Sequence, residues 1–268
     1  MKRAAVVAAV LAIAGLLSAC LPPPPPPPPP TPDKGFDACA APSDSTMTTW
    51  KSSSPYNVVG VYIGGANRGC AQPNLTSTWL ANQRTKGWRM LPIWVGPQAP
   101  CTTLRTTTFS SDPLTAYFTG LNEGDAAANA ASALGLPASS AIYFDLEGYA
   151  RGGACTTAVQ SLIQGWVQKL NERGFKAGMY SSLCSGVLDA AATPYSRQLD
   201  AIWIAAWNNT PNIYGFTACG SPATSSNTLS DTIWSNHQRV HQYVGGHNET
   251  YGGITINIDN DAVDGPTG

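Results

Sequence analysis

Ser140-Ala-Ile-Tyr-Phe-Asp-Leu-Glu147 is a short β-rich run, and Lys176-Ala-Gly-Met-Tyr180 is a second run of the same kind. Between them, Thr156–Arg173 repeats apolar residues at helical spacing and is closed by Gly174. A strand, a helix and another strand in succession predict a unit of two parallel strands with a helix packed across them.

The same alternation continues in both directions along the chain. We expect eight strands: Lys34–Ala38, Asn57–Gly64, Arg89–Val95, Ser140–Glu147, Lys176–Tyr180, Ala201–Trp207, Val240–Val244 and Ile254–Asp259. Further helices are predicted from Ser43 and Asp44 to about Lys51, over Trp79–Lys86 behind the caps Asn74 and Thr76, and over Glu123–Leu134. This pattern fits an α/β fold, a single (β/α)8 TIM-type barrel, which typically takes ~250 residues. The sixth and seventh helices are poorly marked, so we expect the barrel to be irregular in its last third.

The first twenty residues predict a lipoprotein signal peptide (1–20). A basic Met1-Lys-Arg3 precedes a short apolar run, which ends in Leu17-Ser-Ala-Cys20. This run is shorter than the ~20 residues of a membrane-spanning helix. The tetrapeptide resembles the lipobox of bacterial lipoproteins, in which the cysteine is acylated, so lipidation is expected at Cys20. The alternative is an ordinary signal peptide that contains a cysteine.

Residues 21–34 are expected to form a polyproline linker, because Pro22–Pro30 are all proline. Such runs adopt an extended helix of ~3.1 Å per residue and act as semi-rigid spacers. A proline-rich ligand for a partner domain is the alternative. The remaining residues, 35–268, are expected to form the barrel. Together these features predict export and lipid anchoring on the outer face of the cytoplasmic membrane, in the cell envelope.

The composition argues against nucleic acid as a partner. Lys and Arg number 15 against 16 Asp and Glu, and no basic stripe is evident. Only 12% of residues are charged, which suits a neutral polar ligand such as cell-wall polysaccharide. We expect a monomer that uses no cofactor and touches the membrane through its lipid anchor only.

Six cysteines remain once Cys20 is set aside, and an even number in an exported domain favours disulfides. They are Cys39, Cys70, Cys101, Cys155, Cys184 and Cys219. Zinc is less favoured, because no two of them form a CxxC pair. All six lie at or after the ends of predicted strands, where disulfides would join the loops at the barrel mouth. We predict Cys70 with Cys101 first, and Cys155 with Cys184 next.

Acidic residues collect at predicted strand ends, where TIM-type barrels build their sites. Asp37 ends the first strand, Asp145 and Glu147 end the fourth, and Asp259 and Asp261 end the eighth. We therefore expect these carboxylates to meet at one mouth.

Asp145 and Glu147 are two residues apart, so on a strand both face the same side. Like charges held so close raise one pKa, which lets one carboxyl act as a general acid while the other stays ionised. Paired carboxylates of this kind are typical of glycoside cleavage. The alternative is that they cap the following helix.

Aromatic and amide side chains also follow the strands. We predict Tyr62, Tyr180, Trp207 and Gln242 as substrate-binding residues, because sugar rings pack on flat aromatic rings and amides bond hydroxyls. Trp94 and Trp203 are interpreted as core residues. His241 is interpreted as packed or hydrogen-bonded rather than as a base.

Several segments resemble one known family in their order along the chain. They are Gly35-Phe-Asp37, Tyr62-Ile-Gly-Gly65, Pro92-Ile-Trp-Val-Gly96, the stretch from Glu123-Gly-Asp-Ala126 to Leu134-Gly135, Ile142-Tyr-Phe-Asp-Leu-Glu147, Gly178-Met-Tyr-Ser181, Trp203-Ile-Ala-Ala-Trp207, His241-Gln-Tyr243 and Ile258-Asp259. Together they resemble the glycoside-hydrolase-like domain of unknown function, family 1906, of secreted actinobacterial proteins. The resemblance implies a TIM-type barrel and an actinobacterial envelope protein.

The arrangement is more distantly similar to the glycoside hydrolase family 25 lysozymes. That similarity implies Glu147 as general acid and Asp145 as the residue that orients the 2-acetamido group of N-acetylmuramic acid. Asp37 and Asp259 would hold this machinery. Two departures weaken the likeness: Asp37 is followed by Ala38-Cys39-Ala40, and the Gln-Tyr pair follows His241 rather than Trp.

Two hypotheses follow for the function. The first is a glycoside hydrolase that acts on cell-wall glycan, peptidoglycan or a related polysaccharide. The second is a non-catalytic glycan-binding or wall-tethering lipoprotein that uses the same mouth. Amide cleavage is a weaker third hypothesis, because the sequence has no evident zinc site or Cys-His nucleophile.

Overall fold

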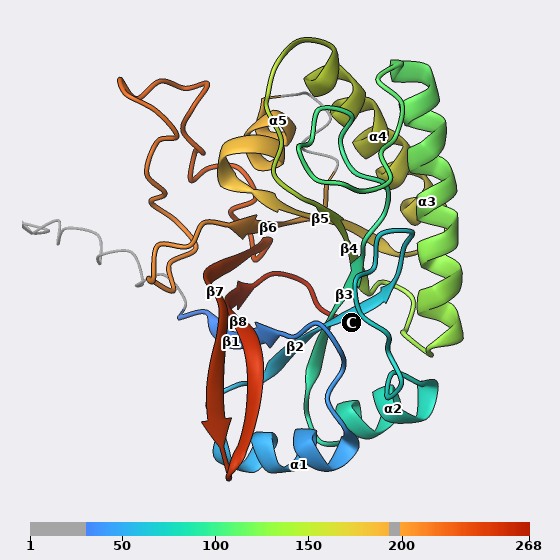
Figure 1. Ribbon diagram of the computed structural model, residues 1–268, viewed down its shortest axis with the longest axis vertical. Helices are drawn as coiled ribbons and strands as arrows, with labels where there is room; N and C mark the ends of the chain where they lie inside the picture. Colours follow the sequence, from blue (N-terminus) through green and yellow to red (C-terminus); the bar gives the residue numbers. More distant parts are fainter. Residues whose placement is uncertain (1–30, 193–198) are drawn as a thin grey trace, which may run out of the picture. The chain divides into compact units, whose positions relative to one another are not determined.

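The computed structural model describes residues 31–192 and 199–268, so the predicted signal peptide, Cys20 and most of the linker lie outside the described residues. Eight strands form a closed barrel in chain order (Figure 1). They are β1 Asp33–Asp37, β2 Val58–Gly64, β3 Arg89–Trp94, β4 Ala141–Leu146, β5 Lys176–Ser182, β6 Ala201–Ala205, β7 Arg239–Tyr251 and β8 Ile254–Asp264. The predicted TIM-type barrel is therefore confirmed.

Helices follow the first five strands. They are α1 Asp44–Ser53, α2 Ser77–Thr85, α3 Pro113–Ala133, α4 Gly153–Glu172, the π-helical turn η1 Leu183–Val187 and the short α5 Leu188–Ala191. The predicted caps Ser43 and Thr76 are confirmed, since each side chain accepts a backbone N–H of the first turn. Helix α3 begins ten residues before the predicted Glu123, because Asp112 caps it and Pro113 opens it.

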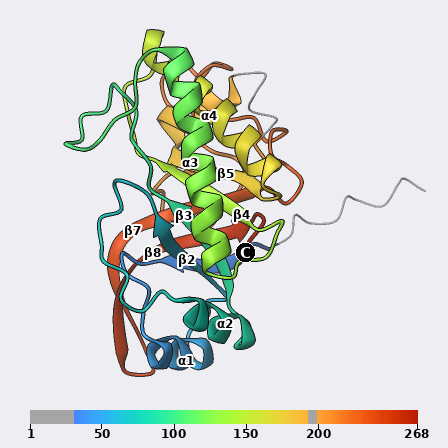
Figure 2. The same cartoon turned by 90° about the vertical axis from the view of Figure 1, so that its right-hand side faces the viewer.

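Helices α3 and α4 lie side by side on the outside of the barrel (Figure 2). Their backbones meet at two glycines: a Cβ on Gly120 would lie 2.1 Å from the Leu162 carbonyl oxygen, and one on Gly165 would lie 2.1 Å from that of Tyr117. Behind them, Trp166 packs edge-on against Phe144 of β4. This packing fixes the end of β4, which carries the candidate catalytic residues.

The last third of the barrel is built differently, as the poorly marked helices predicted. Residues 206–238 connect β6 to β7 without a helix, and β7 and β8 form a long antiparallel hairpin that extends past the barrel beside α1 (Figure 1). Neighbouring strands from β1 to β7 pair in parallel, as predicted, whereas β8 is antiparallel to both of its neighbours. The hairpin turn is Gly252-Gly253, and both residues have positive φ, at 57° and 79°.

The barrel interior is filled by side chains rather than open. Tyr143 and Trp203 pack edge-on inside it, next to the apolar residues Val58, Leu91 and Val240. Within the described residues, no helix has both the length and the apolar character needed to cross a bilayer. The filled interior leaves the carboxyl ends of the strands as the floor of a surface cleft.

Candidate functional site

A cleft of about 170 Å³ opens at the carboxyl ends of the strands. It brings together all eight residues predicted as catalytic or substrate-binding, with Ile93 and Trp203 in its wall: Asp37, Tyr62, Asp145, Glu147, Tyr180, Trp207, Gln242 and Asp259. These side chains come from six different strands and two loops, since Glu147 follows β4 and Trp207 follows β6. The barrel, rather than any single segment, assembles them.

Two further hollows adjoin this cleft, and Glu147 borders all three. One is polar and reaches over Asn67, Gly246 and Asn257. The other is lined mainly by apolar residues, among them Leu183, and shares Trp207 with the central cleft. The three hollows share residues and together form a groove, and Glu147 borders its central cleft, its polar arm and its apolar arm.

Asp37 is held in place at the end of β1 by two donors. Tyr62 Oη donates to Oδ1 and Gln242 Nε2 donates to Oδ2, both at 2.9 Å. Gly60 lies beside it on β2, where a Cβ would come within 2.5 Å of the Asp37 Cβ. Burial, and then the charge of Asp259, raise the pKa of Asp37 to about 7.

Asp259 and Asp261 lie in the middle of β8, which corrects the expectation that they end a strand. Because β8 is antiparallel to β1, Asp259 stands opposite Asp37 and Asp261 stands opposite Gly35, one layer deeper. Trp203 Nε1 donates to Asp261 Oδ1 at 3.0 Å, but Oδ2 meets no N–H or O–H donor among the described residues. Burial, followed by the charge of Asp37, raises the pKa of Asp261 well above its ordinary value.

Asp145 and Glu147 stand at the end of β4 in different surroundings. Asp145 is only 6% exposed, and its Oδ1 has no hydrogen-bond partner in the described chain, whereas Glu147 is exposed at the cleft. Burial, and then the charge of Glu147, raise the pKa of Asp145 well above its ordinary value. Although the residue as a whole is exposed, partial desolvation of its carboxyl group, and then the charge of Asp259, raise the pKa of Glu147 as well. The pair therefore holds protons more tightly than free carboxyls do.

Gln242 links the acidic floor to the aromatic rim. Its Oε1 accepts from Tyr180 Oη and from Trp207 Nε1, both at 2.9 Å, while its Nε2 donates to Asp37. Trp207 is 65% exposed, yet three of its ring atoms would lie 2.8 Å from a Cβ on Gly245. The indole therefore lies flat on the Gly245 backbone and turns its other face outward.

Three residues interpreted as structural are buried in the barrel. Trp94 is 8% exposed and donates to Glu123 Oε2, and Trp203 is 1% exposed. His241 is fully buried, and its ring nitrogens contact the carbonyl oxygens of Ala206 and Asn212. These three side chains support the walls and the connection that carries Trp207.

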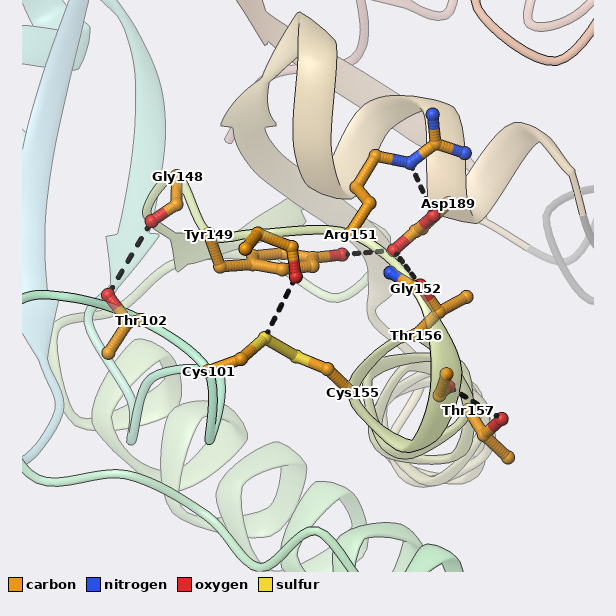
Figure 3. Close-up of a disulfide and its surroundings, with 12 residues drawn as sticks. Cys101, Thr102, Gly148, Tyr149, Arg151, Gly152, Cys155, Thr156, Thr157 and Asp189 are labelled. Carbon is orange, nitrogen blue, oxygen red and sulfur yellow. Dashed lines mark hydrogen bonds and ion pairs between the residues drawn. A yellow bond between two sulfur atoms is a disulfide. The ribbon is translucent and has the colours of Figure 1, made fainter.

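The loop that follows Glu147 is tied down by Asp189 of α5, a residue that the sequence analysis did not single out. Asp189 is 1% exposed and accepts from Tyr149 Oη at 2.8 Å, Arg151 Nε at 2.6 Å and Thr156 Oγ1 at 2.7 Å (Figure 3). Arg151 also reaches the carbonyl oxygen of Ser226. One buried carboxylate thus joins the loops after β4, β5 and β6.

All six cysteines predicted to pair do so, but both predicted pairings are wrong. The disulfides are Cys39–Cys70, Cys101–Cys155 and Cys184–Cys219. Each joins the segments that follow two neighbouring strands, and Figure 3 shows the second, which joins the loop after β3 to the first turn of α4. If Cys70 and Cys101 were paired instead, Cys39 would have no neighbouring partner. One cysteine follows each of the strands β1 to β6. The observed pairing is the one that joins neighbours and leaves none of the six unpaired.

The described residues do not form a metal site at the cleft. Across residues 31–192 and 199–268, no group of three or more His, Cys, Asp or Glu side chains is placed to hold a metal ion.

Comparisons with known proteins support the fold and a family. Residues 48–263 match the family described as Rv2525c-like, glycoside hydrolase-like domain. The chain superposes on the Tat-secreted protein Rv2525c of Mycobacterium tuberculosis with a TM-score of 0.56 at 13% identity, over 86% of this chain and 95% of that one. An uncharacterized B. stearothermophilus protein gives 0.53 at 18% identity, over the same shares. A bacterial lysozyme from Streptomyces coelicolor gives 0.51 at 14%, over 88% and 94%. No curated protein sequence matches the chain. At such identities the superpositions establish a shared fold.

Proposed function

The chain belongs to the family of Rv2525c-like, glycoside hydrolase-like domains, and from that premise we propose that its barrel mouth binds and hydrolyses a cell-wall glycan. The observation that carries this proposal is the pair Asp145 and Glu147, one buried and one exposed, in the central cleft of the groove. Cell-wall lytic enzymes share the fold, including the lysozyme from Streptomyces coelicolor.

Glu147 is proposed as the general acid. Its raised pKa favours the protonated form that a general acid needs, and its exposed position lets it reach the oxygen of a glycosidic bond laid across the groove. That oxygen takes the proton as its bond to the anomeric carbon breaks. Glu147 then acts as the base that accepts a proton from the attacking water.

Asp145 is proposed to orient a 2-acetamido group. Asp145 lines the cleft, and a carboxylate there can accept a hydrogen bond from the amide N–H of an acetamido sugar. The acetamido carbonyl oxygen would then attack the anomeric carbon, forming a cyclic oxazolinium ion that water later opens. An N–H bond to Asp145 favours its ionised form, which leaves the shared proton on Glu147.

Asp37 and Asp259 are proposed to support Asp145 and Glu147 from the floor of the cleft. Each raises the pKa of another member of the acidic cluster, Asp259 that of Asp37 and Glu147, and Asp37 that of Asp145. Tyr62 and Gln242 fix Asp37 directly. Tyr180 and Trp207 then stand on the side of the apolar arm, where a sugar ring can stack.

The test is the release of reducing ends from purified peptidoglycan and arabinogalactan. Glu147→Gln should lower kcat by about 10²–10⁴-fold, the range for loss of a general acid, with the fold intact. Product masses would identify the bond. Equal rates from the parent and Glu147→Gln would contradict the proposal.

A non-catalytic glycan-binding role is the second candidate, and the flat exposed indole of Trp207 favours it. It predicts that the protein sediments with insoluble wall but releases no product. Trp207→Ala should then weaken binding more than Glu147→Gln does, and the reverse order would count against this role.

We also propose that the protein is a lipoprotein of the envelope, anchored through Cys20 and set off the membrane by the proline run Pro22–Pro30, since Asp33 and Lys34 already belong to β1. The three disulfides of the described chain support export, since such bonds persist in oxidising compartments. Mass spectrometry should find acyl chains on Cys20 and a processed N-terminus. Retention of Cys20→Ser in the membrane fraction would contradict the anchor.

A further inference from the structure

Strand β4 extends further than its neighbour β3 at the barrel mouth. The pairing of β3 with β4 stops at Trp94 opposite Phe144, whereas β5 pairs with β4 as far as Leu146. The backbone from Asp145 to Glu147 therefore has no strand beside it on the β3 side. These are the residues on which the proposed chemistry depends.

The side chain of Gln98 fills the gap on the β3 side. Its Oε1 accepts from the Glu147 backbone N–H at 2.7 Å, and its Nε2 donates to the Asp145 carbonyl at 2.8 Å. In a parallel ladder, a residue bonds through its own N–H and C=O to the two residues that flank its opposite number. The carboxamide of Gln98 makes these two bonds around Leu146, as a backbone residue of β3 would.

Gln98 is itself rigidly held. It is 2% exposed, and the second hydrogen of Nε2 is donated to the Gly96 carbonyl at 3.1 Å. Its backbone N–H donates to the Thr107 carbonyl at 2.8 Å, and its carbonyl accepts from Phe109 at 3.0 Å. Hydrogen bonds hold both the backbone and the carboxamide of Gln98, so the carboxamide keeps one position beside β4.

We infer that Gln98 is a positioning residue that extends the β3 edge of the sheet and keeps Asp145 and Glu147 in strand geometry, facing the cleft together. Strand geometry matters because only there do residues i and i+2 point to the same side. Gly148 follows directly, and glycine gives the backbone freedom to turn away. The hydrogen bonds of Gln98 to β4 do not depend on the proposed function. Only the expected effect of Gln98 on turnover rests on that function.

Two substitutions separate the hydrogen bonds from the volume. Gln98→Met keeps a similar shape and makes neither bond. Gln98→Glu keeps the acceptor for Glu147 but, when ionised, turns a negative oxygen towards the Asp145 carbonyl. When protonated, Glu restores one donor and one acceptor.

In the full chain, Gln98→Met should lower kcat by about 10–100-fold, since small misplacements of reacting groups cost up to about 10²-fold, while KM changes little. Gln98→Glu should be as slow at pH 8, but its rate relative to the parent should recover as the pH falls to 4.5. The relative rate of Gln98→Met should show no such recovery at low pH, because methionine has no group that protonation could turn into a donor.

Gln83→Met is the matched control. Gln83 is fully buried and its Nε2 donates to Asp44 Oδ1 at 2.7 Å, away from the cleft. It should lower the Tm about as much as Gln98→Met does and leave kcat unchanged. An equal fall in kcat for both variants would overturn the positioning role.

A second readout does not require turnover. Carbon-13 NMR of the carboxyl groups, assigned with Asp145→Asn, should show the titration of Asp145 moving towards ordinary values in Gln98→Met. Superimposable titrations in the parent and in Gln98→Met would overturn the inference even if the parent releases no product. Absence of product from the parent, with altered titration, would overturn only the proposed hydrolysis. If Gln98→Met fails to fold, Gln98→Glu compared at pH 4.5 and pH 8 gives the same decision.

Discussion

Strands β1 to β5 are each followed by helical structure, whereas β6, β7 and β8 close the barrel without any helix in the described residues. In the helical part, apolar faces cover the strands, as Trp166 covers Phe144. In the last third, buried polar groups hold the covering segment against the strands. Arg239 is fully buried and donates to the carbonyls of Ile213, Ser230 and Ile233. A barrel can thus be closed by hydrogen bonding to irregular backbone where no helix is available. The helical part supplies Asp37, Asp145 and Glu147 to the acidic site, and the last third supplies Asp259 and Asp261.

The largest expected effect comes from removing Arg239. Arg239→Met would leave several buried carbonyls without donors, at about 1–3 kcal/mol each, so we expect the free energy of unfolding to fall by at least about 3 kcal/mol. Urea denaturation measures this. Arg173→Met removes an arginine that pairs with Asp125 on the surface of the helical part, and should cost about 1 kcal/mol or less. Equal losses would mean that the two parts are not stabilised differently.

Removal of a disulfide comes next. Replacing Cys184 and Cys219 by Ser should cost about 2–4 kcal/mol, and so should replacing Cys39 and Cys70, since the closed loops are similar, at 35 and 31 residues. The two variants should differ in hydrogen exchange. Exchange should rise across 206–238 in the first, whereas α1 and α2 should stay protected in the second. Equal protection of 206–238 in both variants would contradict this view of the helix-less connection.

The acidic residues of the cleft come from both parts of the barrel, and they should make the folded protein more stable at pH 5 than at pH 8. Asp37 has a pKa of about 7 in the folded protein against 3.8 for the unperturbed carboxyl, so its contribution is fully present below pH 3.8 and is lost as the pH rises through 7. Between pH 8 and pH 5 we expect a gain of about 2 kcal/mol, seen as a Tm about 4–8 °C higher. Asp37→Asn should flatten the dependence. A Tm that falls from pH 8 to pH 5 would contradict the sign.

The smallest expected effect concerns the platform under Trp207. Gly245→Ala would push the indole off the β7 backbone, and we expect binding of a soluble glycan fragment to weaken about 10-fold, or about 1.4 kcal/mol. Isothermal titration measures it. Gly220→Ala lies in the connection between β6 and β7, which also carries Trp207, and should leave binding unchanged. If both variants bind like the parent, stacking on Trp207 makes no contribution.

Much of the barrel could be predicted because strand and helix patterns are local. The direction of β8 was missed, since alternation of side chains is the same in parallel and antiparallel strands. A signal was present: Gly252-Gly253 between two β-rich runs is typical of a tight hairpin turn. Asp112-Pro113 likewise marks the true start of α3.

The candidate site was harder to predict than the fold. Asp145 and Glu147 could be singled out, because residues two apart on a strand share a face whatever the rest of the chain does. Gln98 and Asp189 could not, since their roles depend on where β3 stops and on which loops meet above α5. The cysteine pairing was missed for a related reason, because it depends on the row of loops as a whole.

The three disulfides also determine how the mouth can deform. They divide the rim into three covalent blocks, each spanning two successive strands: β1 with β2, β3 with β4, and β5 with β6. The seams between blocks are crossed by hydrogen bonds, from Asn67 to Gly96 at the first and from Tyr149 and Arg151 to Asp189 at the second. Since such bonds exchange far more readily than a disulfide, the rim should yield at its seams. The second seam runs between Glu147 and Tyr180, so any opening of the rim there would widen the cleft on the side of the proposed general acid.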